Sequence, residues 1–448
     1  MRRPPDCLSY PLPHDPILIP LAAEAPLIAL RELPGAGDRL KTLRCAAAVA
    51  RHGSAMRAAE AIHLSQPAVT RGVLELERFC GLPLFERSAR GMLATPLGLR
   101  VAQRADALFE QLAQGAAQAA ALATPRARRT ERPERFAAAV TPASLKALLA
   151  VAATASEAKA AEALGVSQPA VHQALRALEH LVGGVVFQRS VRGTRLTDAG
   201  EALLLQVKLA YGEARAIDSE IAAWRGEIRG RVLIGALPLS VSLLLPRAID
   251  AVLREHPDIE ITVVDGTYDN LMRQLRAADI DLVIGALREA PPGVRQETLV
   301  EEPLAVIARA GHPCLRRRGL TLVDLRAWDW VVPLPGTPAS AALQRVFAAA
   351  GLEPPRDALQ ASSAMFTRAI VACTDRLALT SHGQALEDEQ GGALRRLPVE
   401  LPLTTRAVGI ALRESGEPSP DLRVVLESLR RGARSGVDKQ NEYLGRAS

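Results

Sequence analysis

The sequence has few of the residues and runs that build disulfide-bonded, metal-binding or membrane proteins. Its five cysteines, Cys7, Cys45, Cys80, Cys314 and Cys373, are odd in number and form no Cys-x-x-Cys pair. This scatter argues against a disulfide framework or a zinc site and favours a reducing, cytoplasmic location. No apolar run reaches the roughly 18 residues of a membrane helix. Proline and acidic residues also interrupt the N-terminal stretch, where a signal peptide would need a clean apolar core.

Catalytic patterns are scarce as well. The eight histidines are dispersed, with no His-x-x-x-His or His-Glu-x-x-His spacing. Asp279 and Asp281 in "ADIDLVIG" fit residues at the start of a strand. Catalysis would require a nucleophile with a base, paired carboxylates or a metal cluster. The sequence therefore predicts no enzyme, no cofactor and no metal site.

The composition predicts a multidomain globular protein. A chain of 448 residues is too long for one core and suggests two to four domains. With 48% hydrophobic and 23% charged residues it is typical of a folded chain. The formal net charge of +6 weakly favours an anionic partner.

The most informative feature is an internal repeat. "SQPAV" occurs at residues 65–69 and again at 167–171, an offset of 102 residues. "AAEA" precedes both copies and "R-S-x-R-G" follows both, and every pair keeps the same offset without a gap. An ordered set of motifs at one constant spacing indicates a duplicated domain.

Each copy has the pattern of two helices with a tight break between them. In the first copy Ser65 is a good N-cap for the second helix, and Pro67 is tolerated because it falls in the first turn. Val69, Val73 and Leu76 recur at helical spacing and should face the core.

The polar residues left at the exposed start of that helix suit DNA. Gln66, Thr70 and Arg71 cluster there, as they would on a recognition helix in the major groove. The following "GLPLFERSARGMLATPLG" predicts a short hairpin with Arg87 and Arg90 at its tip, suited to phosphates or a narrow minor groove. A small helical domain with an ordinary polar outer face is the alternative, and finding the whole constellation twice argues against it.

"RAAEAIHLSQPAVTRGVLELERFCGLPLFERSARG" resembles the N-terminal winged helix-turn-helix of the LysR-type bacterial transcriptional regulators. In that family the S-Q-P-A-V-S-R-type helix enters DNA, the wing carries R-x-x-R-G, and a long linker helix dimerises. The resemblance implies DNA contacts from the recognition helix and wing of each copy. These residues are Ser65, Gln66, Pro67, Thr70, Arg71, Arg87 and Arg90 in the first copy, and Ser167, Gln168, Pro169, His172, Gln173, Arg189 and Arg192 in the second.

The chain departs from the family by having two copies, and the copies are unequal. The second has His-Gln at 172–173 and "LVGGVVFQRS" where "GLPLFERS" would be usual, so either copy could have lost contact with DNA. Arg71 offers the stronger contact, so the first copy is predicted to read sequence. The second adjoins the long helix over 197–228 and is predicted to carry dimerisation, so that a dimer would present up to four winged helices.

The C-terminal half alternates strands and helices. "RVLIGA", "IEITVVD" and "IDLVIGA" are continuous apolar runs, as in buried parallel strands. The span resembles the effector-binding domain of LysR-type regulators, especially the subgroup of the galactose-binding-protein regulator and its protocatechuate-pathway relatives. That resemblance implies two α/β subdomains, like a type 2 periplasmic binding protein, with hinge crossings near 304–310 and 404–411.

Hydroxyls and free N–H groups at helix starts suit a carboxylate or a polyol. A cap for its own helix is the equally weighted alternative for each Ser or Thr. The expected effector-binding residues are Pro238, Ser240, Ser242, Gly266 and Thr267 in the first subdomain, and Gly336, Thr337, Ser362 and Ser363 in the second.

The predicted fold is two all-α/winged helix-turn-helix domains and a long linker helix, followed by an α/β domain of two subdomains. The predicted segments are an irregular N-terminal arm at 1–38, winged helix-turn-helix domains at 39–98 and 139–196, a helix and Arg-rich linker at 99–138, a linker and dimerisation helix at 197–229, an effector-binding domain at 230–430, and a C-terminal tail at 431–448.

These features predict a cytoplasmic, effector-responsive transcriptional regulator. Its expected partners are double-stranded DNA, a small anionic or sugar-like effector and further copies of the chain, as a homodimer or tetramer. RNA polymerase is a further candidate, and no membrane is expected. Two alternatives stay open. A protein-interaction adaptor or sensor would have lost DNA binding in one or both copies. A transport receptor would account for the C-terminal half alone.

Overall fold

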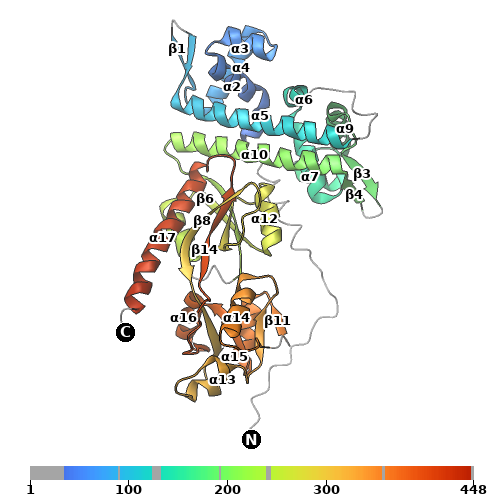
Figure 1. Cartoon of the computed structure of the whole chain (residues 1–448). Coiled ribbons are helices and arrows are strands. Elements are labelled where there is room, and N and C mark those ends of the chain that lie inside the picture. Colours follow the sequence, from blue (N-terminus) through green and yellow to red (C-terminus); the bar gives the residue numbers. More distant parts are fainter. Residues whose placement is uncertain are drawn as a thin grey trace.

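The computed structural model describes residues 35–88, 91–123, 133–190, 193–238, 244–355 and 359–444. Helices and two small hairpins fill the upper part in Figure 1, and an α/β part with two sheets hangs below them. Most of the predicted N-terminal arm and of the Arg-rich linker lies outside the described residues. The last residues of that arm form a short 3-10 helix, η2 (Gly35–Arg39).

The first helix-turn-helix copy has the predicted order of helices and wing. Ser54 caps the helix that precedes the recognition helix, α3 (Ala55–Ile62), by accepting a hydrogen bond from the Arg57 N–H. Val69, Val73 and Leu76 are buried, as the helical spacing predicts. The elements are α2 (Leu40–His52), α3 (Ala55–Ile62), α4 (Gln66–Cys80), β1 (Phe85–Ser88), β2 (Gly91–Ala94) and α5 (Pro96–Leu122).

The second copy repeats the first element by element. A short helix, α6 (Pro133–Ala139), precedes it. Each later element begins and ends 102 residues after its counterpart, and this includes the long helix at the end. The duplication therefore extends through the linker helix, beyond the motifs that reveal it in the sequence. The elements are α7 (Pro142–Thr154), α8 (Glu157–Leu164), α9 (Gln168–Val182), β3 (Phe187–Ser190), β4 (Gly193–Leu196) and α10 (Asp198–Trp224).

A glycine is required where each wing meets its long helix. A Cβ added to Gly98 would lie 2.0 Å from the carbonyl oxygen of Leu84, and one added to Gly200 would lie 2.1 Å from that of Val186. The Thr95 hydroxyl donates to the Leu84 carbonyl and accepts from the Gly98 N–H, which caps α5. The same backbone approach is thus built twice, and it fixes each hairpin against its long helix.

The two long helices pack against each other within one chain. In Figure 1, α5 and α10 lie side by side and run in opposite directions, with the first copy at one end of the pair and the second copy at the other. Their inner faces share one hydrophobic core, with Leu108 and Leu112 from α5 and Leu203 and Val207 from α10. The helix predicted to carry dimerisation thus buries its apolar face against its own duplicate in this chain.

The first α/β subdomain is built on a mixed sheet of order β6-β5-β7-β14-β8. The three strands predicted from apolar runs, β5, β6 and β7, are parallel neighbours in this sheet. The elements are β5 (Gly230–Ala236), α11 (Leu244–Glu255), β6 (Ile259–Asp265), α12 (Tyr268–Arg276), β7 (Leu282–Ala286), β8 (Val294–Glu302), β14 (Arg406–Arg413) and α17 (Pro420–Leu444). The last helix continues through most of the segment predicted as a C-terminal tail.

The second subdomain has a sheet of order β11-β10-β12-β9-β13. Its elements are β9 (Leu304–Arg309), η3 (Pro313–Arg316), α13 (Leu322–Leu325), β10 (Trp330–Pro333), α14 (Pro338–Ala349), β11 (Leu359–Ala361), α15 (Ala364–Cys373), β12 (Leu377–Ser381), α16 (His382–Gln390) and β13 (Leu394–Arg396).

The chain crosses between the subdomains at Pro303 and again between Leu401, which still packs on the core of the second subdomain, and the start of β14 at Arg406. The predicted hinge segments, 304–310 and 404–411, begin at these crossings and continue into strands β9 and β14. The two crossings touch, because the Leu304 N–H donates to the Thr404 hydroxyl over 3.4 Å.

Candidate nucleic-acid interface and interdomain cavity

The start of α4 presents polar side chains that the first copy does not use internally. Ser65, Gln66, Pro67 and Arg71 are exposed, and Thr70 is half-buried. Ser65 is the N-cap residue, yet its side chain forms no capping hydrogen bond within the described residues. Arg71 forms no ion pair with any residue that the structure describes. A cation and hydroxyls at the positive end of a helix dipole suit an anionic partner.

The corresponding start of α9 is partly occupied by contacts within the second copy. Ser167, Gln168, Pro169, His172 and Gln173 are all exposed. The Ser167 hydroxyl caps its own helix by accepting from the Ala170 N–H. His172 Nδ1 lies 3.2 Å from Glu157 Oε2. The structure therefore places an acidic side chain beside the predicted second recognition helix, a residue that the motif comparison missed.

The equivalent of Glu157 in the first copy is Ala55. Replacing Glu157 by Ala is expected to raise affinity for DNA two- to fivefold at low salt, because it removes a negative charge from a surface that is predicted to face phosphates. Electrophoretic or fluorescence-anisotropy titration at low and high salt measures this change. Replacing Glu162, which is shared with the first copy as Glu60, is the matched control and should change affinity less. Weaker binding after Glu157→Ala would show that His172 needs this carboxylate.

The wings keep one backbone anchor in each copy. The Met92 N–H donates to the Gly53 carbonyl oxygen over 2.9 Å, and the Thr194 N–H donates to that of Ala155 over 3.0 Å. Arg87 and Arg189 belong to strands β1 and β3. Arg90 and Arg192 lie outside the described residues. The hairpins thus have the predicted form, and the DNA contacts expected of these arginines stay predictions.

The charge balance differs between the copies. Residues 40–99 hold eight Lys and Arg against four Asp and Glu, a net charge of +4. The equivalent residues 142–201 hold six against five, a net charge of +1. Arg71 in the first copy corresponds to Gln173 in the second. The first copy therefore attracts phosphates more strongly.

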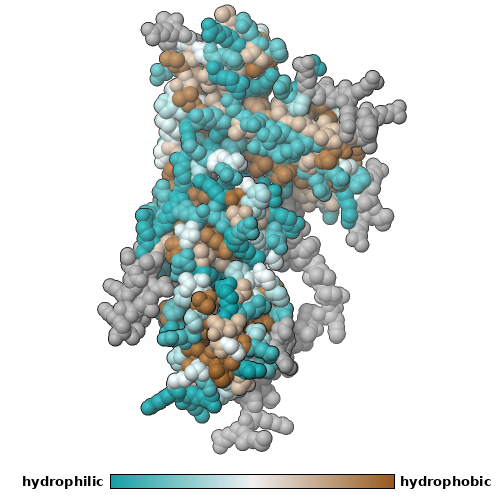
Figure 2. All heavy atoms as spheres, viewed as in Figure 1, coloured by the Kyte–Doolittle hydropathy of each residue, from teal (hydrophilic) through white to brown (hydrophobic). Residues whose placement is uncertain are grey.

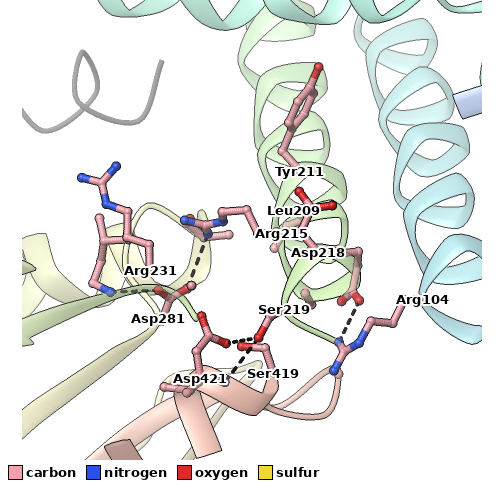
Figure 3. Close-up of a pocket in the computed structure, with 18 of the residues that line it drawn as sticks. Arg104, Leu209, Tyr211, Arg215, Asp218, Ser219, Arg231, Asp281, Ser419 and Asp421 are labelled. Carbon is pink, nitrogen blue, oxygen red and sulfur yellow. Dashed lines mark hydrogen bonds and ion pairs between the residues drawn. The ribbon is translucent and has the colours of Figure 1, made fainter. Parts of the chain in front are cut away.

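A cavity of about 910 Å³ lies where the long helices meet the first α/β subdomain (Figure 3). Charged contacts from α10 cross this junction: Lys208 Nζ lies 2.8 Å from Asp279, and Arg215 lies 3.4 Å from Asp281. The hydroxyl of Ser219 donates to the buried carboxylate of Asp421 over 2.8 Å. These pairs connect the first subdomain directly to α10.

Asp218 on α10 lines this cavity, and burial raises the pKa of its carboxyl to about 6. The Ala36 N–H donates to it over 3.1 Å, which opposes the rise. Between about pH 4 and pH 6 the folded state keeps a proton that the unfolded state has released, so this group lowers stability as pH rises through that range.

Asp218→Asn is expected to remove this dependence, which amounts to at most about 3 kcal/mol. The measurement is the unfolding midpoint of the unaltered chain and of the variant, each at pH 4.5 and at pH 7. On going from pH 4.5 to pH 7, the variant should lose less stability than the unaltered chain. An identical pH profile for both proteins would contradict the assignment.

Three of the predicted effector-binding residues, Thr267, Thr337 and Ser363, are N-cap residues, and two of them cap their own helices with their side chains. The Thr337 hydroxyl accepts from the Ser340 N–H and donates to the Leu334 carbonyl oxygen, and the Ser363 hydroxyl accepts from the Phe366 N–H. Thr267 is the exposed N-cap of α12, where its side chain forms no capping bond within the described residues. Pro238, Gly336 and Ser362 are exposed, Gly266 is half-buried, and Ser240 and Ser242 lie outside the described residues.

The surface of the second subdomain mixes polar and apolar groups. Figure 2 shows hydrophobic residues among hydrophilic ones at the lower end of the molecule. Met365 and Phe366 in the first turn of α15 are 82% and 47% exposed. They directly follow Ser362 and Ser363, so this helix start offers apolar as well as polar contacts.

The described residues also bear on metal binding and on membrane spans. No three His, Cys, Asp or Glu side chains gather there as ligands for a metal ion would. No single helix among them has the length and apolar composition to cross a membrane. The bent pair of α6 and α7 passes the same test of length and composition, and its side chains Phe136, Leu145 and Leu148 belong to the hydrophobic core.

Two winged helix-turn-helix units joined to a two-subdomain α/β domain define a DNA-binding regulator with an effector-binding domain. Residues 40–99 and 142–201 each match the model of the bacterial regulatory helix-turn-helix protein, lysR family, and residues 225–434 match the LysR substrate binding domain. The chain belongs to the LysR family of bacterial transcriptional regulators.

Individual relatives align over different lengths. The HTH-type transcriptional regulator GalR of Pseudomonas putida is 35% identical over 406 residues, which cover 89% of this chain and 97% of that protein. The regulator PcaQ of Agrobacterium fabrum is 30% identical over 287 residues, or 63% of this chain and 92% of PcaQ. The crystal structure of full-length CbnR with its target DNA has the same fold. It has a TM-score of 0.50 and 23% identity, and the match covers 64% of this chain and 98% of CbnR.

Proposed function

We propose that this regulator reads its DNA site mainly through the first helix-turn-helix copy, with the second copy as a weaker neighbour. The difference between the two recognition helices carries the proposal. Arg71 is exposed and without an ion pair in the described structure, whereas the second copy has Gln173 at that position and a carboxylate against His172. An arginine can grip phosphate or read guanine with two hydrogen bonds, which glutamine cannot match on guanine.

The effector is proposed to be a small anionic or sugar-like molecule bound between the two α/β subdomains. Two crossings connect the subdomains, and helix starts carrying Thr267 and Ser362 are exposed to receive hydroxyl or carboxylate groups. Binding there would shift the balance between arrangements of the subdomains and so act on α10 through its charged contacts. The regulator is proposed to work in the bacterial cytoplasm, where its DNA lies.

The test is DNA binding at two salt concentrations by the unaltered protein, Arg71→Ala and Gln173→Ala. Fragments come from the region upstream of the protein's own gene. Arg71→Ala is expected to weaken binding at least tenfold, in line with the roughly 1–3 kcal/mol of one good base contact. Gln173→Ala is expected to weaken it about threefold or less.

Salt dependence separates this function from the adaptor alternative. A protein that neutralises several phosphates loses affinity steeply as salt rises. No salt-dependent binding to any fragment would favour an adaptor that no longer contacts DNA. A larger loss from Gln173→Ala than from Arg71→Ala would reverse the assignment of the two copies.

A further inference from the structure

The long helices α5 and α10 are equivalent parts of the two copies, 102 residues apart. The side chains that they bring to their contact nevertheless differ, and they complement each other. Arg104 of α5 corresponds to Gln206 of α10, while Glu213 and Glu220 of α10 correspond to Gln111 and Gln118 of α5. Two-fold antiparallel packing relates each contact on one side of the pair to an equivalent contact on the other. The two sides can therefore be compared residue by residue.

One side of the pair is ionic. Arg104 is nearly buried and lies 3.2 Å from Glu213 and 3.1 Å from Glu220 across the helix contact. On the other side, the equivalent of the Arg104–Glu220 contact is a hydrogen bond of 3.4 Å from the Gln206 amide to Gln118. One ionic side and one amide side make the pairing of α5 with α10 different from the pairing of either helix with itself.

Side-chain size is complementary as well. Leu108 and Leu112 near the middle of α5 correspond to Ala210 and Ala214 of α10. All four are buried in one core. Toward the end of α5, Gly115 corresponds to Ile217, and a Cβ on Gly115 would lie 2.9 Å from the Cβ of Gln206. Large residues on one helix thus match small ones on the other.

Pairing each helix with its own copy in a second chain would lose these matches. Two α5 helices would bring Arg104 against Gln111 and Gln118 with no acid, and would crowd Leu108 and Leu112 against themselves. Two α10 helices would bury Glu213 and Glu220 without a cation and leave gaps at the alanines. Unpaired buried charge and poor packing both destabilise a helix pair.

We infer that one chain is by itself a complete two-headed DNA-reading unit, in which α5 pairs with α10 of the same chain. The end of α5 already lies at the second copy, because the Ala123 Cβ is 3.1 Å from the position of a Cβ on Gly184. One effector domain then serves two helix-turn-helix copies. That the unit reads DNA rests on the proposed function, whereas the pairing itself does not.

Disulfide capture tests the pairing in the full chain without DNA. Gly115→Cys and Gln206→Cys are introduced together, with Cys7 and Cys373 replaced by Ser. A Cβ on residue 115 would lie 2.9 Å from the Cβ of residue 206. The two atoms therefore need to move apart by less than about 1 Å to enter the normal disulfide range of about 3.5–4.5 Å between Cβ atoms. Oxidation is expected to remove both thiols and to leave a band of one-chain mass on a non-reducing denaturing gel. A band of two-chain mass would overturn the inference.

Co-expression of the two single-cysteine chains distinguishes an exchanged arrangement, in which α5 of one chain pairs with α10 of another. No disulfide between chains is expected above the amount that each single variant forms alone. A several-fold excess of mixed two-chain product would overturn the inference.

A second measurement uses the unaltered chain, in case Gly115→Cys perturbs the fold. Lys146 of α7 lies 2.5 Å from Asp38 of η2, so this ion pair joins the two halves. A zero-length carbodiimide reagent should couple this amine and carboxylate. The Asp38–Lys146 cross-linked peptide is expected in the band of one-chain mass, and its occurrence only in a two-chain band would contradict the inference.

Discussion

Replacing Glu220 by Gln is expected to lower the free energy of unfolding by about 3 kcal/mol. Glu220 is only 3% exposed, and its Oε1 atom accepts from Arg100, Arg104 and Arg423 at 3.1, 3.1 and 3.2 Å. These arginines come from α5 and α17, so one carboxylate connects three long helices. A neutral amide would leave the guanidinium groups close together without the charge that compensates them.

This loss of stability is at the lower end of the range for breaking a buried ion pair. The reason is that Arg104 still has its ion pair with Glu213, and Arg100 still has its ion pair with Glu417. Thermal unfolding should show a midpoint lowered by roughly 6–12 °C. Gln118→Ala, at the equivalent exposed position of α5, is the control and should stay within about 0.5 kcal/mol. Equal, small effects of both substitutions would contradict the role given to the ionic side.

Gly98→Ala is expected to destabilise the first helix-turn-helix copy by about 3 kcal/mol, the upper end for overpacking. The added methyl group would meet the Leu84 carbonyl oxygen at 2.0 Å, and this is backbone that cannot rotate away. The Thr95 hydrogen bonds that hold wing and helix together use the same carbonyl. The wing and the recognition helix of this copy should therefore lose their fixed arrangement.

Gly200→Ala is the matched variant in the second copy, where the clash with the Val186 carbonyl oxygen is nearly the same. Both variants should lower the unfolding midpoint to a similar degree. Specific DNA binding should fall at least tenfold in Gly98→Ala and much less in Gly200→Ala, because the first copy is proposed to read the sequence. Stronger loss of DNA binding in Gly200→Ala would contradict that proposal.

Local patterns in the sequence predict much of this fold. The amphipathic helices on either side of Ser65, the wings and the first parallel strands follow from short-range spacing, which acts the same way in any tertiary context. The predicted hinge segments start at the two crossings but extend into strands β9 and β14, because the apolar residues there belong to the strands that follow each crossing. The segment 431–448 is predicted from the sequence only as a C-terminal tail, and the extension of the final helix to Leu444 is not predicted.

The pairing of α5 with α10 could not be predicted from either helix alone. An apolar stripe shows that a helix buries one face, and it does not show whether the partner belongs to the same chain. A signal was nevertheless present, since comparing positions 102 residues apart sets Arg104 against Gln206 and Gln118 against Glu220. Likewise, the motif identified His172 but not its neighbour Glu157, because the contact depends on how α8 packs beside α9.

The measurement that tests the account most directly is a hydroxyl-radical footprint of the full chain on DNA from upstream of its own gene. Two neighbouring protected segments of unequal strength are predicted, one for each copy on the shared pair of long helices. Arg71→Ala should abolish the stronger segment, and Gln173→Ala should reduce only the weaker one. A single protected segment, or a stronger segment that survives Arg71→Ala, would contradict the account.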